Sequence, residues 1–243
     1  MNPAKRPAHK PLFLAEWDRV LMIHFEVDPA ALQSETPFTI DRRDGRAFVS
    51  LVAFTIRGMR LRCGGVLGRL LVAPIATHEF LNVRTYLAGD DTHAIQFLAE
   101  WLPNRMSCFL GPRVFSLPYH LGKLRYHHAH ETGDLTGEVV DARTRRRFRY
   151  RARLPRPTCW AMCPAGSRDE WLMERYAACN CAGGRRRRFC VAHEPWRQSA
   201  AELLELDCDL LCAHWPWFRD ARCIGVNYSP GLREVGMGFP ELC

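Results

Sequence analysis

The chain has 243 residues, of which 47% are hydrophobic, and a formal net charge of +8. This length suits one large domain or two small ones, and the apolar share is typical of a folded chain rather than a disordered one. The longest apolar runs, Val20–Phe25 and Gly65–Ile75, are too short or too interrupted to cross a bilayer, so we expect no membrane partner. The amino-terminal residues are basic, but Glu16 and Asp18 interrupt the apolar segment that follows, which argues against an export signal.

The eleven cysteines suggest a disulfide-bonded protein and the positive charge suggests a nucleic-acid-binding protein, but other features of the sequence disfavour both. An odd number of cysteines in a chain of this size without an export signal indicates reduced thiols, so we expect a cytoplasmic location. Only Lys5, Lys10 and Lys123 are lysines, and the arginines that supply the remaining charge accompany no nucleic-acid-binding motif. We therefore expect no nucleic-acid partner. The sequence also lacks the motifs of serine hydrolases, phosphate-binding loops and nicotinamide enzymes.

The first half of the chain is predicted to form strands after a tail. Residues 1–12 contain three prolines and indicate a flexible tail, whereas residues 13–243 contain no internal repeat or long linker, which favours a single domain. A tight turn at residues 43–45 precedes a strand over Arg46–Arg62. Because this strand is apolar on both alternating faces, we expect it to be covered on both sides.

The remaining elements are mostly strands as well. Those before residue 142 are strands at Thr77–Leu87 and Ala94–Leu102, a helix at Asn104–Leu110, and strands at Lys123–His130 and Gly137–Asp141. In Arg146–Leu154, four arginines alternate with apolar residues, the pattern of a half-buried antiparallel strand whose arginine stripe faces water. Ser167 and Glu170 form a capping box that predicts a helix through about Cys179. Strands at Arg188–His193 and Cys223–Tyr228 complete an α+β pattern.

Six short segments occur in a fixed order along the chain. They are Trp17 with His24, Glu79–Tyr86, Phe115–Tyr119, Glu174–Tyr176, His193–Trp196 and Tyr228–Gly231. Their order and spacing resemble those of the YqjF-like family, domain of unknown function 2071, in the acetoacetate decarboxylase-like superfamily. The resemblance implies an α+β fold, an antiparallel β-cone or barrel with flanking helices and a central cavity, over residues 13–243.

The resemblance also draws attention to a pair of lysines. Decarboxylases of this superfamily form a Schiff base between the substrate and a lysine whose pKa is depressed by an adjacent lysine. That pair follows a proline, and the matching positions after Pro118 are Tyr119 and His120, neither of which forms a Schiff base. The resemblance therefore implies the fold without the lysine machinery. Lys123 is the alternative Schiff-base residue, although lysines are usually on the surface.

Glu79 is the leading candidate for a catalytic acid or base. It shares an otherwise apolar strand face with Leu81 and Val83, where a carboxylate is costly to bury unless it is paired or serves a site. The resemblance implies a pocket position, because a glutamate in the comparable strand of the decarboxylases lines the pocket. A structural ion pair or an exposed sheet edge is the alternative. Whether the face of Glu79 or that of Arg84 meets the cavity stays open, since both faces of this strand are expected to be buried.

The candidate ligand-binding residues are Arg84, Asn82, His24, Tyr119 and His120. Arg84 suits a carboxylate ligand, with a structural salt bridge as the alternative. His24 suits a general acid or base, with a satisfied core histidine as the alternative. The hydroxyl of Tyr119 either points into the cavity or packs against the wall.

A zinc site is the alternative suggested by the cysteines and histidines. Cys179, Cys181, Cys190 and His193 partly match the spacing of structural zinc ligands. The resemblance carries His193 but no cysteine cluster, so we assign no metal and no other cofactor.

The sequence thus predicts a protein that binds or converts a small organic acid or carbonyl compound in a central cavity. The alternative is a non-catalytic structural or interaction protein whose cavity is filled by side chains. Whether the chain is an enzyme, which ligand it selects and whether it forms a homo-oligomer all stay open at this point.

Overall fold

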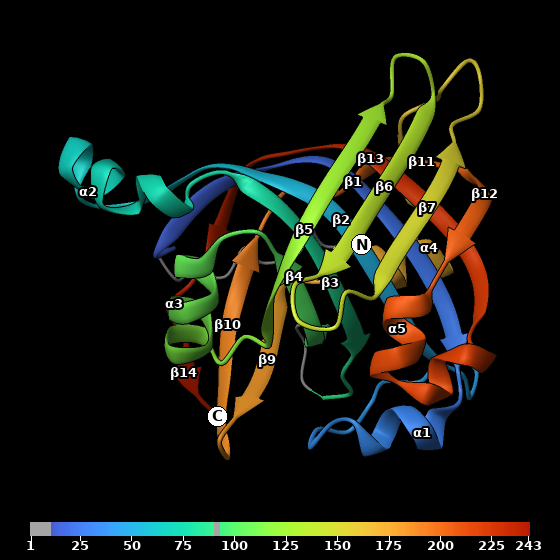
Figure 1. The fold of residues 1–243 in the computed structure, drawn as a ribbon, viewed down its shortest axis with the longest axis horizontal. Helices are drawn as coiled ribbons and strands as arrows, with labels where there is room; N and C mark the ends of the chain where they lie inside the picture. Colours follow the sequence, from blue (N-terminus) through green and yellow to red (C-terminus); the bar gives the residue numbers. More distant parts are fainter. Residues whose placement is uncertain (1–10, 90–92) are drawn as a thin grey trace.

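The computed structural model describes residues 11–89 and 93–243, so almost all of the predicted tail, residues 1–12, lies outside the described part. The main feature is one strongly curved sheet with short helices around it (Figure 1). This arrangement confirms the predicted α+β class with few helices.

The strands contain about half of the chain. They are β1 (Phe13–Val27), β2 (Ala47–Leu61), β3 (His78–Tyr86), β4 (Ala94–Leu102), β5 (Tyr119–Ala129), β6 (Asp134–Asp141), β7 (Arg147–Arg153), β8 (Ala161–Met162), β9 (Ala177–Ala182), β10 (Arg185–Ala192), β11 (Arg197–Ala200), β12 (Glu202–Asp207), β13 (Arg222–Met237) and β14 (Glu241–Leu242).

The helices are short. They are α1 (Pro29–Ser34), α2 (Gly65–Val72), η1 (Ala73–Ile75), α3 (Arg105–Phe115), α4 (Arg168–Met173), α5 (Asp209–His214) and η2 (Pro216–Asp220). Within residues 11–89 and 93–243, no helix has both the length and the apolar character needed to cross a membrane.

Most of the elements predicted from the sequence occur at or near the predicted residues. Strand β4 has its predicted bounds, and the turn before β2 has positive φ angles at Asp44 (54°) and Gly45 (76°), as a tight hairpin requires. The capping box is also confirmed, since Glu170 N donates to Ser167 Oγ at 3.1 Å. The predicted helix is too long, however. It ends at Met173, because the residues from Ala177 onward pair with two other strands as β9.

Seven of the strands close into a ring. From β1 the pairing runs antiparallel to β2, β3 and β4, and in the other direction from β1 to β13 and then β10. Strand β9 joins the two ends, because it pairs with β10 and, in parallel, with β4. The ring is therefore a barrel with a parallel seam, and its short β4–β9 and β10–β13 pairings make it uneven.

Parallel pairing makes the sheet mixed rather than purely antiparallel. Besides its contact with β9, β4 pairs in parallel with β5. The chain leaves β4, passes through α3 and returns in the same direction, and such a crossover is what a parallel connection requires. Beyond β5 the sheet continues antiparallel through β6, β7 and β12.

The wall made by β1 to β4 is covered on both faces, as predicted for the strand over residues 46–62. One face packs into a solid core with β5, β6, β7 and α5, and this core contains Leu51, Leu81, Val83 and Trp101. The other face lines the inside of the seven-stranded ring. Alternate residues of a single strand therefore face two different interiors, the solid core and the inside of the ring.

The arginine stripe of β7 faces water, as predicted. Arg147, Arg149, Arg151 and Arg153 are exposed, whereas the residues between them are buried. The neighbouring strand β12 is acidic, and Arg151 forms an ion pair with Glu205 at 3.3 Å. Acidic neighbours thus balance part of the positive charge of this face.

Candidate functional site

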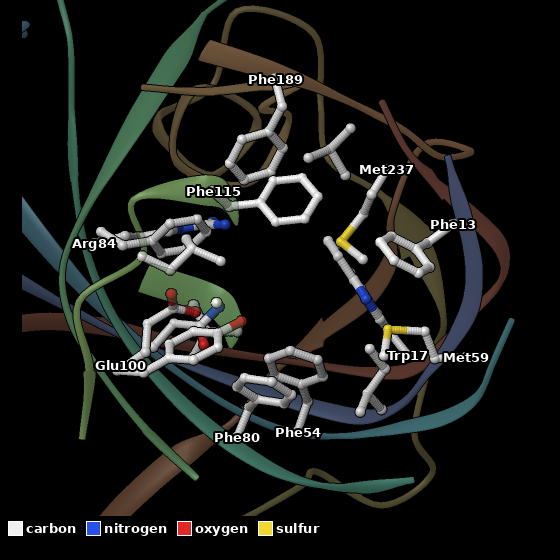
Figure 2. Close-up of a pocket in the computed structure, with 18 of the residues that line it drawn as sticks. Phe13, Trp17, Phe54, Met59, Phe80, Arg84, Glu100, Phe115, Phe189 and Met237 are labelled. Atoms are coloured by element: carbon white, nitrogen blue, oxygen red, sulfur yellow. The ribbon is translucent and has the colours of Figure 1, made fainter. Parts of the chain in front are cut away.

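The seven-stranded ring encloses a cavity of about 200 Å³. Its lining is mainly aromatic and aliphatic, and Figure 2 shows these side chains arranged around an open centre. The labelled apolar residues are Phe13, Trp17, Phe54, Met59, Phe80, Phe115, Phe189 and Met237. Polar groups meet this apolar space at only a few places, and those places define the candidate site.

The central polar feature is a row of three side chains on adjacent strands. Asn82 of β3 pairs with Glu100 of β4, and Glu100 pairs in parallel with Tyr119 of β5. All three residues line the cavity. The register of the sheet therefore brings an amide, a carboxyl group and a phenol side by side on one wall.

Glu100 is the buried carboxyl group of the site. It is 3% exposed, and its Oε2 atom has no hydrogen-bond partner within the described part of the chain. Burial raises the pKa of Glu100 well above its ordinary value of 4.5, because the cavity solvates a carboxylate poorly. A protonated carboxyl group both donates and accepts hydrogen bonds, so Glu100 can act as a donor or as a general acid.

Two arginines give the cavity a positive charge. Arg84 of β3 follows Asn82 on the same face, and its Nη2 donates to the carbonyl oxygen of Leu172 at 3.0 Å. Its Nε atom is buried and has no partner among the described residues. Figure 2 shows Arg84 and Glu100 on the same side of the cavity. An arginine with an unused donor at an apolar cavity is suited to an anionic ligand.

Arg175, after α4, is the second arginine. Its guanidinium lies over the rings of Tyr86 (4.7 Å) and Trp171 (4.3 Å), and its Nη1 atom is 3.7 Å from Asp41, too far for a hydrogen bond. Burial, only partly opposed by neighbouring groups, lowers the pKa of Arg175 to about 10, so it still carries its charge at neutral pH.

Two segments of the family resemblance meet at the cavity edge beside Arg175. Glu174 accepts a hydrogen bond from Trp196 N at 2.8 Å, and the rings of Tyr176 and His193 stack at 4.7 Å. His193 Nε2 lies 3.2 Å from the carbonyl oxygen of Arg175. These contacts fix the backbone that carries Arg175.

Glu79, the predicted acid or base, lies on the opposite face of β3. It lines a second, polar depression with Arg57, Tyr126 and His127, outside the ring cavity. Among the described residues no hydrogen bond or ion pair involves Glu79, so the alternative of a structural ion pair finds no support. The face of β3 that meets the cavity is the one carrying Asn82 and Arg84.

His78 is the residue that the two hollows share. It lines both the cavity and the polar depression, and neither ring nitrogen has a partner within the described residues. Burial lowers the pKa of His78 to about 4, so the ring is neutral at physiological pH.

The other predicted ligand-binding residues separate into two groups. Tyr119 lines the cavity with Asn82 and Arg84, and burial, followed by the charge of Glu100, raises its pKa well above the usual value. His120 lies on the other face of β5, where its ring stacks on Trp101 at 5.1 Å. Tyr119 and His120 therefore lie on opposite faces of β5, Tyr119 toward the cavity and His120 toward Trp101.

His24 is not among the lining residues of the cavity but lies next to them. Its Nδ1 atom is 2.6 Å from Ser50 Oγ, and Ser50 pairs with Arg84 across β2 and β3. Burial, and then the charge of Arg84, lower the pKa of His24 to about 3. Its Nε2 atom is buried without a hydrogen-bond partner among the described residues, so His24 is a core histidine with a partner at one ring nitrogen only.

The remaining alternatives lie away from the cavity chemistry. Lys123, the one lysine of the described part of the chain, is exposed on β5 and does not line the cavity. Over residues 11–89 and 93–243, no group of three or more His, Cys, Asp or Glu residues is arranged to hold a metal ion. Cys179, Cys181 and Cys190 are free thiols on the β9–β10 hairpin.

Sequence reasoning did not identify Glu100 or Arg175 as site residues. Glu100 is the one acidic residue of the predicted strand Ala94–Leu102, and the cost of burying a carboxylate applies to it as it does to Glu79. Arg175 lies within a segment that carries the family resemblance. Both signals were therefore present in the sequence.

The fold matches solved structures of acetoacetate decarboxylase-like proteins. An acetoacetate decarboxylase-like enzyme from Sphingomonas wittichii RW1 is similar with a TM-score of 0.63 and 17% identity, and the match covers 100% of this chain and 98% of that one. Acetoacetate decarboxylase from Legionella pneumophila is similar with a TM-score of 0.65 and 9% identity, over 100% and 91% of the two chains. The enduracididine biosynthesis enzyme MppR, with HEPES bound, has a TM-score of 0.63 and 12% identity, over 98% and 90%.

At these identities the likeness shows the fold alone, and the sequence shows the family. The model of the uncharacterised conserved protein family DUF2071 matches residues 14–232, nearly the whole chain. The chain belongs to the DUF2071 family, which confirms the resemblance drawn from the six segments. No curated protein sequence matches the chain.

Proposed function

We propose that this protein binds or converts a compact organic acid or carbonyl compound in the ring cavity, without lysine Schiff-base chemistry. The observation that carries the proposal is the buried carboxyl group of Glu100, whose Oε2 atom has no partner among the described residues. It lies between Asn82 and Tyr119 on a largely apolar cavity wall, on the same side of the cavity as Arg84 (Figure 2). Such a group is costly to keep in a protein interior unless a ligand supplies its missing partner.

The size of the cavity limits the ligand. An apolar cavity of roughly 150 Å³ accommodates benzene, so about 200 Å³ suits one small ring or a branched chain together with a carboxylate or carbonyl group. Phe54 and Phe80, which stack at 5.5 Å, provide an apolar surface for such a body. A hollow of this size favours ligand binding over the alternative of a structural protein with a filled cavity.

The polar groups of the cavity would determine the orientation and the charge of the ligand. The unused Nε of Arg84 and the guanidinium of Arg175 would offset the cost of burying a carboxylate. Protonated Glu100 would donate to a carbonyl oxygen and thereby polarise it, the step that enolisation or addition at a carbonyl carbon requires. Within the proposal, the acid role that the sequence assigned to Glu79 passes to Glu100, and a role for Glu79 stays a prediction for the outer depression.

The described features also suggest where the protein acts and which partner it does not take. All eleven cysteines are free thiols, which supports the proposed location in the reducing cytoplasm. The arginine stripe of β7 lies beside acidic β12, so we propose no nucleic-acid function.

Ligand-dependent melting tests the proposal. Purified protein would be screened with small aromatic acids, branched keto acids and neutral aldehydes, as wild type and as Arg84→Gln, Glu100→Gln and Glu79→Gln. We expect wild type and Glu79→Gln to be stabilised by at least one compact acid, and Arg84→Gln to lose most of that stabilisation. Glu100→Gln keeps a neutral donor, so it should bind but lose any turnover of the same compound.

Two results would contradict the proposal. Failure of every compact acid and carbonyl compound to stabilise the folded wild type would favour the structural alternative. Equal stabilisation of wild type and Arg84→Gln would show that the acid binds elsewhere.

A further inference from the structure

The largest unexplained feature lies on the outside of the molecule. The described part of the chain has twelve exposed large hydrophobic side chains, and eight of them belong to just two helices. On α2 they are Val66, Leu67, Leu70 and Leu71, which are 64–75% exposed, and on α3 they are Met106, Phe109, Leu110 and Val114, which are 37–56% exposed. A surface helix normally turns its apolar stripe toward the core, whereas these two helices turn theirs outward.

The two helices lie on one side of the molecule and are connected through η1 (Figure 1). Helix α2 leads directly into η1, and the Asn104 side chain at the start of α3 donates to the carbonyl oxygen of Pro74 in η1 at 2.6 Å. Figure 1 shows α2 projecting from the body of the molecule on the same side as α3 and β14. We call the eight side chains of α2 and α3 the apolar face. Exposed large apolar side chains that gather on one side of a protein mark an interaction surface.

The rim of the apolar face is basic. Residues 57–78 and residues 101–130 contain arginines but no aspartate or glutamate. Arg57 and Arg60 are balanced by Asp18 and Glu234, whereas Arg62, Arg69 and Arg105 have no acidic partner within the described ranges. Exposed apolar side chains on helices whose charged residues are all arginines are complementary to an anionic surface with an apolar interior.

The charge also argues against a second copy of the chain as the occupant. Two copies that met through this face about a two-fold axis would place the same basic surface on both sides of the interface. Like charges placed across an interface oppose association, and here no acidic residue of α2 or α3 is available to balance them.

The cavity lies directly behind this face. Leu110 and Val114 line the cavity and are also among the exposed side chains. Met59 and Ile75, which stand on either side of α2 in the sequence, line the cavity too. A surface in contact with the apolar face would thus lie next to the site.

We propose that the apolar face docks this protein on an anionic phospholipid bilayer, with the α2 side chains among the headgroups and upper acyl chains. The sequence led us to expect no membrane partner, because no segment is long enough to span. Peripheral docking needs no such segment, since the eight residues of α2 only have to lie in the interface. The proposal does not depend on the ligand of the cavity.

Vesicle co-sedimentation of the full chain tests it. The vesicles would contain phosphatidylcholine alone, or phosphatidylcholine with phosphatidylglycerol. The variants are Leu67→Ser/Leu70→Ser on the apolar face and Arg62→Gln/Arg69→Gln on its rim. The matched control is Met162→Ser, which removes a side chain that is 64% exposed on β8. Melting curves and gel filtration of each variant would accompany the binding data.

We expect wild type and Met162→Ser to bind the anionic vesicles, and to bind less as salt is raised. The double leucine variant should bind roughly a hundredfold more weakly, because each leucine that enters the bilayer contributes about a factor of ten. The arginine variant should lose the preference for phosphatidylglycerol. Absence of binding by folded wild type, or equal binding by the leucine variant, would overturn the proposal. A wild-type dimer that the leucine substitutions dissociate would assign the face to a second copy instead.

Discussion

Replacing Glu100 with glutamine should change how the stability of the protein depends on pH. In the folded state Glu100 is 3% exposed, and burial raises its pKa well above the ordinary 4.5 that it regains on unfolding. Between these two values the folded state binds one more proton than the unfolded state. The free energy of unfolding therefore falls as pH rises through this window, by about 1.4 kcal/mol for each pH unit.

The assay is a set of melting curves or urea denaturation curves between pH 5 and 8. For a chain of this size, about 1.4 kcal/mol corresponds to a change in Tm of about 3–6 °C for each pH unit. The glutamine variant carries no ionisable group at this position, so it should lose that slope and become the more stable protein at the alkaline end. Other titrating groups are common to both proteins and cancel in the difference.

Glu79→Gln is the matched control, because it removes a carboxyl group from the opposite face of β3 and leaves Glu100 intact. It should retain the wild-type slope. Parallel curves for wild type and Glu100→Gln above pH 5 would refute the conclusion that this carboxyl group is protonated in the cavity.

Three further outcomes follow from the structure. Buried His24 has a pKa of about 3 against 6.5 when unfolded, so its neutral form stabilises the fold above pH 6.5 and this contribution is lost as pH falls toward 3. His24→Ala should cost about 2–4 kcal/mol at pH 7 in urea denaturation, since it leaves a cavity and removes one of the two hydrogen bonds of Ser50 Oγ, and it should flatten the acid limb. A methyl group at Gly111 would overlap the Tyr119 ring and displace it within the cavity. Gly111→Ala should therefore reduce the ligand-induced rise in Tm by a larger fraction than it reduces the Tm of the ligand-free protein. Arg151→Ala should change stability by less than about 0.5 kcal/mol in the same denaturation assay, because its ion pair with Glu205 is exposed.

The sequence predicted the strands well because their apolar content is local. The strand over Arg46–Arg62 is apolar on both faces in the sequence, and the structure covers both faces of β2. The end of the helix after Ser167 was wrong for the opposite reason. Pairing with β4 and β10, strands far away in the chain, decides that Ala177–Ala182 is extended. Strand β1 was not predicted, since charged residues such as Glu16 and Asp18 interrupt its apolar pattern.

A β-bulge decides on which face of β4 Glu100 lies, and strict alternation of residues along a strand does not predict a bulge. Counting alternate residues from Ile95 places Phe97, Ala99 and Trp101 together, and leaves Glu100 on the other face. A bulge in β4 between the Val83–Ala99 and Arg84–Phe97 pairs shifts the alternation by one residue. Phe97 and Glu100 therefore both line the cavity. Sequence reasoning selected Arg84, Asn82 and Tyr119 for the same interior but could not place the carboxyl group beside them.

The wall shared by two interiors has a consequence for how this fold can change. Along β3, Leu81 and Val83 hold the solid core together, whereas Asn82 and Arg84 face the hollow one. Substitutions at alternate positions of one strand thus act on separate properties, folding on one side and ligand selection on the other. A library restricted to the hollow side can exchange the chemistry of the cavity while the solid core continues to supply stability. The same separation would let members of one family diverge in ligand and keep a common scaffold.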